Sequence, residues 1–183
     1  RWWTRALPGV AFALAATVAS AADGDPDPTF GTGGLVVLSG ISQYSEATAV
    51  VPLADGRILV GGRYRNSAGG IAYSFVTRLL ADGTVDASFG TAGRFLFSPG
   101  GLTELAVDGN GRIVAAGIAD LNTWVARLTA DGALDGGYGV AGVASFGLGS
   151  DRGCRLALHA DGRATVAVTR WDFSAPNLVQ EVV

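Results

Sequence analysis

The motif DPTFGTGG at residues 27–34 recurs as DASFGTAG at 86–93 and as DGGYGVAG at 135–142. Each copy combines an Asp, an aromatic residue and several glycines in the same order. The copies are separated by roughly 50–60 residues, a spacing typical of proteins that stack one supersecondary unit many times. The sequence therefore predicts a repeat architecture.

Two further motifs recur between the copies of the first. One reads ADGRILVGG at 54–62, GNGRIVAAG at 109–117 and ADGRATVAV at 160–168; the other reads FVTRLLADGTVD at 75–86 and WVARLTADGALD at 124–135. Because the three motifs keep one order, we divide the chain into repeat units at about 27–85, 86–134 and 135–183. These units make up one domain, which spans residues 22–183.

Each unit contains several short apolar runs joined by turn sequences. In the first unit the runs lie at 35–38, 47–53, 57–61 and 73–80. Asp-Gly between two apolar runs is a strong hairpin signal, because Gly tolerates positive φ and Asp hydrogen-bonds within its own turn. Four short strands in a unit of this length are typical of one propeller blade. We expect an all-β fold, a partial β-propeller of about three four-stranded antiparallel blades.

The first unit is longer than the second in two places, around residues 39–46 and 64–71. Successive antiparallel strands reverse direction, so both insertions are expected on one face and the Asp-Gly turns on the other. A varying face of a repeat protein often binds partners. Loops also tolerate insertion without any function, and the sequence leaves both explanations open.

The first 21 residues have the order of a secretory signal peptide. Arg1 and Arg5 form a basic start, residues 6–18 are mostly apolar, and Ala19-Ser20-Ala21 is a cleavage sequence of small residues. A buried helix is the alternative. The apolar run is too short to span a membrane. We expect a secreted, periplasmic or cell-surface protein, and a chain without Met that ends inside a repeat is expected to be part of a longer product.

Composition argues against nucleic-acid binding. The 183 residues carry a formal net charge of −3, and the 13 basic residues, all Arg, form no basic stripe. Cys154 is the single cysteine, so we expect a buried thiol and no disulfide within the chain.

The motifs resemble the delta-60 repeat family of bacterial β-propeller repeats, whose blades are similar to those of the NHL type. The match covers residues 25–170 and rests on three groups of positions: Asp86, Ser88, Phe89, Gly90 and Gly93; Asp55, Gly56 and Arg57; Arg78, Asp82 and Gly83. The third unit departs from the pattern with Gly136-Gly137 and Tyr138. The resemblance implies an exported or surface-attached bacterial protein, and it carries over no catalytic residue.

By analogy with NHL-type blades, the strands at 47–53, 102–107 and 154–158 line the central channel. Alignment by their turns makes Ala49, Glu104 and Arg155 equivalent, and it makes Leu53, Asp108 and His159 equivalent. Glu104 and Arg155 are the candidate ligand-binding residues at the channel mouth. The alternative is an ion pair that closes a water-filled channel and contributes at most about 1 kcal/mol.

Other candidate sites fail on residue type. Asp23, Asp25 and Asp27 alternate as in a calcium loop, but Pro28 and Gly34 stand where Gly and Glu are needed. His159 is the single His and is expected at a strand end. We therefore predict no catalytic residue, no metal site and no cofactor.

Two sets of repeated residues are expected to hold the repeats together. Arg57, Arg112 and Arg163 each follow an Asp-Gly or Asn-Gly turn and are expected to pair with turn carboxylates. Phe30, Phe89 and Tyr138 are expected to wedge between blades.

The function expected from these observations is that of a non-catalytic binding or scaffold module with a protein or glycan ligand. The alternative is a propeller enzyme of the lyase, lactonase or glycosidase type, completed by further blades. An arc of three blades leaves unpaired strand edges near 35–38 and 177–183. We expect the isolated chain to self-associate through these edges.

Overall fold

The computed structural model describes residues 24–98, 100–147, 149, 151–170 and, as backbone, 178–182. The predicted signal peptide at 1–21 lies outside the described residues. The described part of the chain contains eleven strands: β1 (Tyr44–Pro52), β2 (Ile58–Arg65), β3 (Ala72–Leu79), β4 (Arg94–Phe97), β5 (Gly101–Val107), β6 (Ile113–Ala119), β7 (Asn122–Leu128), β8 (Val143–Phe146), β9 (Asp151–Leu158), β10 (Ala164–Arg170) and β11 (Leu178–Val182).

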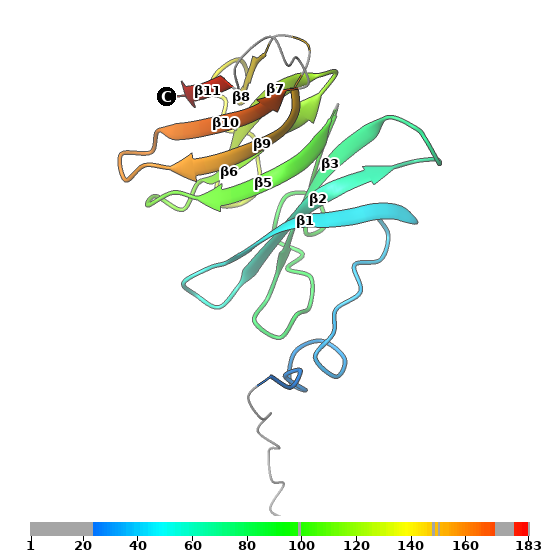
Figure 1. The fold of residues 1–183 in the computed structure, drawn as a ribbon. Coiled ribbons are helices and arrows are strands. Elements are labelled where there is room, and N and C mark those ends of the chain that lie inside the picture. The colour runs from blue at the N-terminus through cyan, green and yellow to red at the C-terminus, as the bar shows by residue number, and fades with distance from the viewer. Residues whose placement is uncertain (1–23, 99, 148, 150, 171–177, 183) are drawn as a thin grey trace, which may run out of the picture.

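The strands form three antiparallel sheets. The first sheet has the order β1-β2-β3-β4, the second β5-β6-β7-β8, and the third β9-β10-β11. The sheets follow one another face to face along the chain, with β1, β5 and β9 next to one another across the sheets (Figure 1). This arrangement confirms an all-β, partial β-propeller, and it confirms that the strands before the Asp-Gly turns lie together.

In the first and second sheets, the outermost strand comes from the following sequence repeat. β4 belongs by sequence to the second unit, yet it pairs with β3, with Val76 opposite Phe95. The equivalent run at 35–38, which we expected to be a strand of the first sheet, forms no strand there. The physical reason is the path of the chain. Residues 35–38 lead into β1, which forms one edge of the first sheet, and β4 already occupies the other edge.

One apolar core lies between the first and second sheets, and another lies between the second and third sheets. Alternate residues of β6, in the second sheet, contribute to one core and then to the other. Ile113 and Ala115 of β6 pack toward the first sheet, while Val114 and Ala116 pack toward the third. Phe89 lies in the first core and Tyr138 in the second, and both are buried. The expected wedges between blades are therefore confirmed for Phe89 and Tyr138. Phe30 is half-buried and belongs to neither core.

The Asp-Gly turns have the backbone that their sequence predicts. Gly83 has φ +85° and Gly132 has φ +84°, in the left-handed region that favours glycine. Each glycine also lies against a wedge aromatic: a Cβ on Gly132 would come 2.7 Å from the Phe89 ring, and one on Gly83 would come 3.1 Å from the Phe30 ring. Backbone conformation and the close ring both require glycine.

We predict that Gly83→Val and Gly132→Val each lower the free energy of unfolding by about 1 kcal/mol or more, because a β-branched residue tolerates positive φ badly. Denaturant melts measure the change. Gly109→Val is the control, since no heavy atom lies within 4 Å of a Cβ at Gly109 and its φ is not positive. If both variants have the same free energy of unfolding as the control, the turn assignment is wrong.

Candidate functional site

The two residues predicted at the channel mouth meet in the structure. Arg155 of β9 donates from Nη1 to Oε1 of Glu104 on β5 at 2.7 Å. The Arg155 side chain is 80% exposed and that of Glu104 is 27% exposed. An ion pair in contact with water contributes at most about 1 kcal/mol. The pair therefore leaves most of the Arg155 surface open to solvent beside the inner strands.

The second equivalent set, at the ends of these strands, does not form a site. Asp108 accepts hydrogen bonds from the Arg112 side chain and from the backbone N–H groups of Asn110 and Arg112. Burial alone would raise the pKa of Asp108, but these hydrogen bonds outweigh burial and lower it. His159 is exposed and shares a 2.7 Å hydrogen bond with Thr165. Asp108 thus closes its own turn.

The arginines that follow the turns pair with turn carboxylates, as expected. Arg57 contacts Asp55 at 2.6 Å, Arg112 contacts Asp108 at 2.7 Å, and Arg163 donates to Asp161 at 2.8 Å. The carboxylate of each pair also accepts the backbone N–H of its arginine. The repeated charges therefore hold the turns.

A second set of arginines connects the sheets, a role that the sequence analysis did not assign to them. Arg78 of β3 donates to the Asp86 carboxylate at 2.7 Å, to the Ser88 hydroxyl at 3.1 Å and to the carbonyl oxygen of Ala130 at 2.7 Å. Its guanidinium carbon lies 4.9 Å from the centre of the Phe89 ring. We call this group the Arg78 clamp. Ala130 belongs to the turn after β7, so the clamp binds the second sheet to the first.

The clamp is buried, and each of its two charged side chains has the other as a hydrogen-bond partner. Arg78 is 2% exposed and Asp86 is 8% exposed. The pKa of Asp86 falls to about 2, mainly because the Ser88 hydroxyl donates to it, with the Ser88 backbone and Arg78 adding to the effect against the opposing influence of burial. The next repeat has the same pair in Arg127 and Asp135, at 2.8 Å beneath Tyr138, but Gly137 supplies no hydroxyl.

Cys154 lies in the core between the second and third sheets. It is buried, and its sulfur is 3.0 Å from the Thr103 hydroxyl of β5. Burial raises the pKa of the thiol, which keeps the less nucleophilic thiol form. The expected role as a small buried residue is confirmed.

The ends of the strands opposite the Asp-Gly turns differ between the repeats. Residues 66–71 connect β2 to β3, whereas residues 120–121 make the same connection in the second sheet. The segment at 39–43 enters β1 at the same end, because Tyr44 pairs with Arg65 and Arg65 pairs with Ala72. Both insertions thus lie at one end, which we call the loop end, as the sequence predicted.

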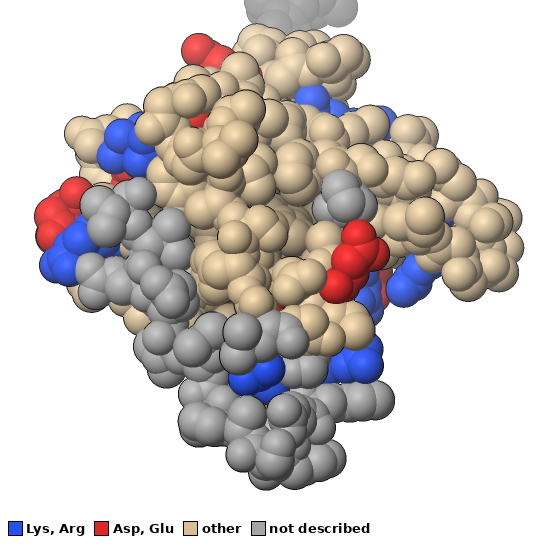
Figure 2. All heavy atoms as spheres, turned by 90° about the horizontal axis from the view of Figure 1, so that it is seen from above, with Lys and Arg blue, Asp and Glu red and all other residues tan. Residues whose placement is uncertain are grey.

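Aromatic and charged side chains line the loop end of the first sheet. Tyr64 and Tyr73 stack with their ring centres 5.3 Å apart, and Tyr44 is exposed. Arg63 pairs with Glu46 at 2.8 Å. On the face shown in Figure 2, charged side chains form small separate groups rather than a stripe.

Two kinds of feature are absent from the residues that the structure describes. No three His, Cys, Asp or Glu side chains gather there as a metal-binding group. Within the same residues, no helix has the length and apolar character that crossing a membrane requires.

We predict that Arg78→Gln lowers the free energy of unfolding by about 2 kcal/mol or more, because it removes the hydrogen-bonded cation of the buried Asp86 and leaves Arg57, whose Nη1 lies 3.6 Å from the carboxylate. The matched control is Arg63→Gln, which breaks the exposed pair with Glu46 and should cost at most about 1 kcal/mol. Urea melts of the two variants compare them. Equal costs would show that the clamp is not a main source of stability.

Comparison with known proteins agrees with this geometry. Residues 53–89 and 109–138 match the family model described as "Domain of unknown function (DUF5122) beta-propeller". No curated protein matches the chain. The matched residues include the Asp-Gly turns at 55–56, 82–83 and 131–132, the Arg78 clamp and the Phe89 and Tyr138 wedges. The match supports a β-propeller repeat family, in agreement with the partial β-propeller fold of the chain.

Proposed function

We propose that this chain is an exported β-propeller module, a non-catalytic binding or scaffold domain of a larger bacterial protein with repeats of the delta-60 type. The observation that carries the proposal is the contrast between the two ends of the blades. At the turn end, the repeated Asp and Arg residues bind one another. At the loop end, the connections differ in length from repeat to repeat.

The loop end offers the chemistry of a recognition surface. The stacked Tyr64 and Tyr73 rings flank the connection at 66–71, and the exposed Tyr44 stands at the start of β1. Aromatic side chains combine an apolar ring with a polar tip, a combination that suits a protein or glycan ligand. On the inner strands, Arg155 and Glu104 add an ion pair in which the Arg155 side chain is largely exposed.

The second candidate is a propeller enzyme whose active site needs further blades. One observation favours it: Glu104 lies on an inner strand, where carboxylates from several blades could converge. Glycosidases of most families work with a pair of carboxylates. A lyase, lactonase or glycosidase would then use Glu104 as one member of such a pair.

A glycan array separates the two candidates. We expect the chain to bind one class of glycan, which mass spectrometry then recovers unaltered. A variant in which a two-residue turn replaces residues 66–71 should lose binding. The matched control Val140→Ser changes an exposed apolar residue at the opposite end and should bind as the parent does.

The outcomes discriminate between the candidates. If the parent converts a glycan to a product of altered mass and the Glu104→Gln variant does not, the protein is an enzyme and the proposal of a non-catalytic binding module is wrong. Absence of binding to every glycan would remove this class of ligand and leave a protein as the ligand.

Export and association are predicted together. Residues 1–21 have the order of a signal peptide, so protein secreted by a bacterial host should begin near Ala22. Unpaired sheet edges promote association, so this material should scatter light as more than a monomer. N-terminal sequencing and light scattering measure the two. Uncleaved protein confined to the cytoplasm would contradict export, and a monodisperse monomer would contradict association through open edges.

A further inference from the structure

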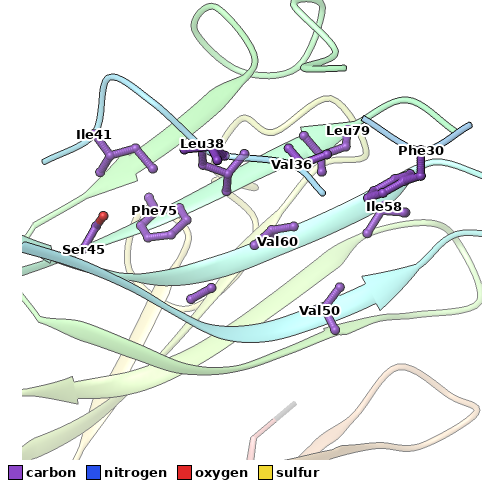
Figure 3. A pocket seen from close by; sticks show the side chains of 12 residues that line it. Phe30, Val36, Leu38, Ile41, Ser45, Val50, Ile58, Val60, Phe75 and Leu79 are labelled. Atoms are coloured by element: carbon purple, nitrogen blue, oxygen red, sulfur yellow. The ribbon is translucent and has the colours of Figure 1, made fainter. Parts of the chain in front are cut away.

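An apolar groove of about 650 Å³ lies on the face of the first sheet that points away from the second sheet. Six residues of β1, β2 and β3 line its floor: Ala47, Val50, Ile58, Val60, Phe75 and Leu79. The segment at 36–41 crosses above them, and Val36, Leu38 and Ile41 lie over the floor (Figure 3). We call this the first-sheet groove.

The same face of the second sheet is buried against a blade. The residues equivalent to the groove floor are Leu102, Leu105, Ile113, Ala115, Trp124 and Leu128, and all six belong to the core between the first and second sheets. Val50 is 67% exposed, whereas its equivalent Leu105 is 8% exposed. The groove is thus a blade-binding face without its blade.

One strand of the absent blade is already in place. The Phe30 loop sits on the turn of Gly83 as the Phe89 loop sits on the turn of Gly132. The backbone N–H of Gly31 donates to the backbone carbonyl oxygen of Asp82 at 2.7 Å. In the same way, the backbone N–H of Gly90 donates to the backbone carbonyl oxygen of Asp131 at 2.7 Å. The run at 36–38 therefore holds the position of β4, but no described strand pairs with it.

Asp27 lacks the cation that its equivalents have. Asp86 accepts from Arg78 and Asp135 accepts from Arg127, each arginine coming from the third strand of the preceding sheet. Among the described residues, the Asp27 carboxylate accepts only from the backbone and hydroxyl of Thr29. Its equivalence to Asp86 places an incoming arginine here.

We propose that the first-sheet groove docks a three-stranded antiparallel sheet of this same repeat, with an arginine at the position of Arg78. The third strand of that sheet pairs with residues 36–38, its apolar face fills the groove, and its arginine donates to Asp27. The inference rests on the packing between blades and not on the proposed ligand at the loop end.

A second copy of this chain fits the groove less well. Its third sheet has three strands, and the equivalence of β11 to β3 would place β11 beside residues 36–38. In that register β11 carries Glu181, which pairs with Thr165 as Arg78 pairs with Leu59. A glutamate at the register position of Arg78 supplies a negative charge where Asp27 needs a cation, and like charges repel. The repeat that the groove selects therefore carries arginine.

The test adds the missing sheet to the full chain. A copy of residues 44–85 is inserted between Pro26 and Asp27, with Thr in place of Ile58 and Val60 within the copy so that the added sheet presents no second groove. The control insertion carries Glu at the copy of Arg78. Hydrogen exchange by NMR follows the backbone amides of 35–38 in the parent and in both extended chains.

The arginine-bearing insertion should slow exchange at 35–38 by about tenfold or more, since unpaired amides near the surface become part of a sheet. The glutamate-bearing insertion should not. Amides that exchange as in the parent, whether the added sheet folds or not, would overturn the proposal. Equal slowing by both insertions would overturn the role of Asp27 and admit a second copy as occupant.

A pair of substitutions locates the docking face. In the extended chain, Val50→Glu should restore the exchange rates of the parent, because Val50 lies on the groove floor. Leu96→Glu, on an exposed residue of β4 outside the groove, should leave the slowed exchange unchanged. The reverse pattern would place the added sheet elsewhere.

Discussion

The salt bridge between Arg78 and Asp86 is the interaction on which the rest of the structure depends. It stands where the chain leaves one sheet and begins the next repeat, and it is buried beneath the Phe89 wedge. Because Arg78 also binds the Ala130 carbonyl oxygen, one guanidinium holds the wedge loop and the next sheet together. Breaking this buried pair is costly because Asp86 then keeps Arg57 at 3.6 Å in place of a hydrogen-bonded cation.

The clamp also explains how sequence repeat and blade come to be offset. The motif that begins with Asp86 is held to the preceding sheet by Arg78, so the strand that follows it, β4, completes that sheet. Each repeat thus gives its first strand to its predecessor. The first-sheet groove and Asp27 follow from the same rule, since the first repeat has a strand to give and no described sheet receives it.

Much of this could be predicted from the sequence because local chemistry decides it. The Asp-Gly turns, the wedge aromatics and the pairs made by Arg57, Arg112 and Arg163 lie within short motifs. The alignment of turns even brought Glu104 and Arg155 together. The prediction of a strand of the first sheet at 35–38 was wrong, because spacing along the chain does not say which sheet such a run joins; the equivalent run β4 pairs with the preceding sheet.

Arg78 and Arg127 were missed as the link between blades for a related reason. Their partners Asp86 and Asp135 lie eight residues away along the chain, too far for the pair to belong to a single tight turn. The contact of Arg78 with Ala130 joins residues that are distant in sequence, so no local pattern predicts it. Repetition of an arginine in the third strand and an aspartate at the start of the next motif was the available signal.

Native-state hydrogen exchange tests most directly whether the clamp makes neighbouring blades one cooperative unit. The slowest amides of β2 and β6 are followed at increasing denaturant below the unfolding transition. The account predicts that both sets reach one opening free energy with one denaturant dependence, since the first sheet cannot open without releasing the second. Two separate opening free energies that persist up to the transition would contradict it.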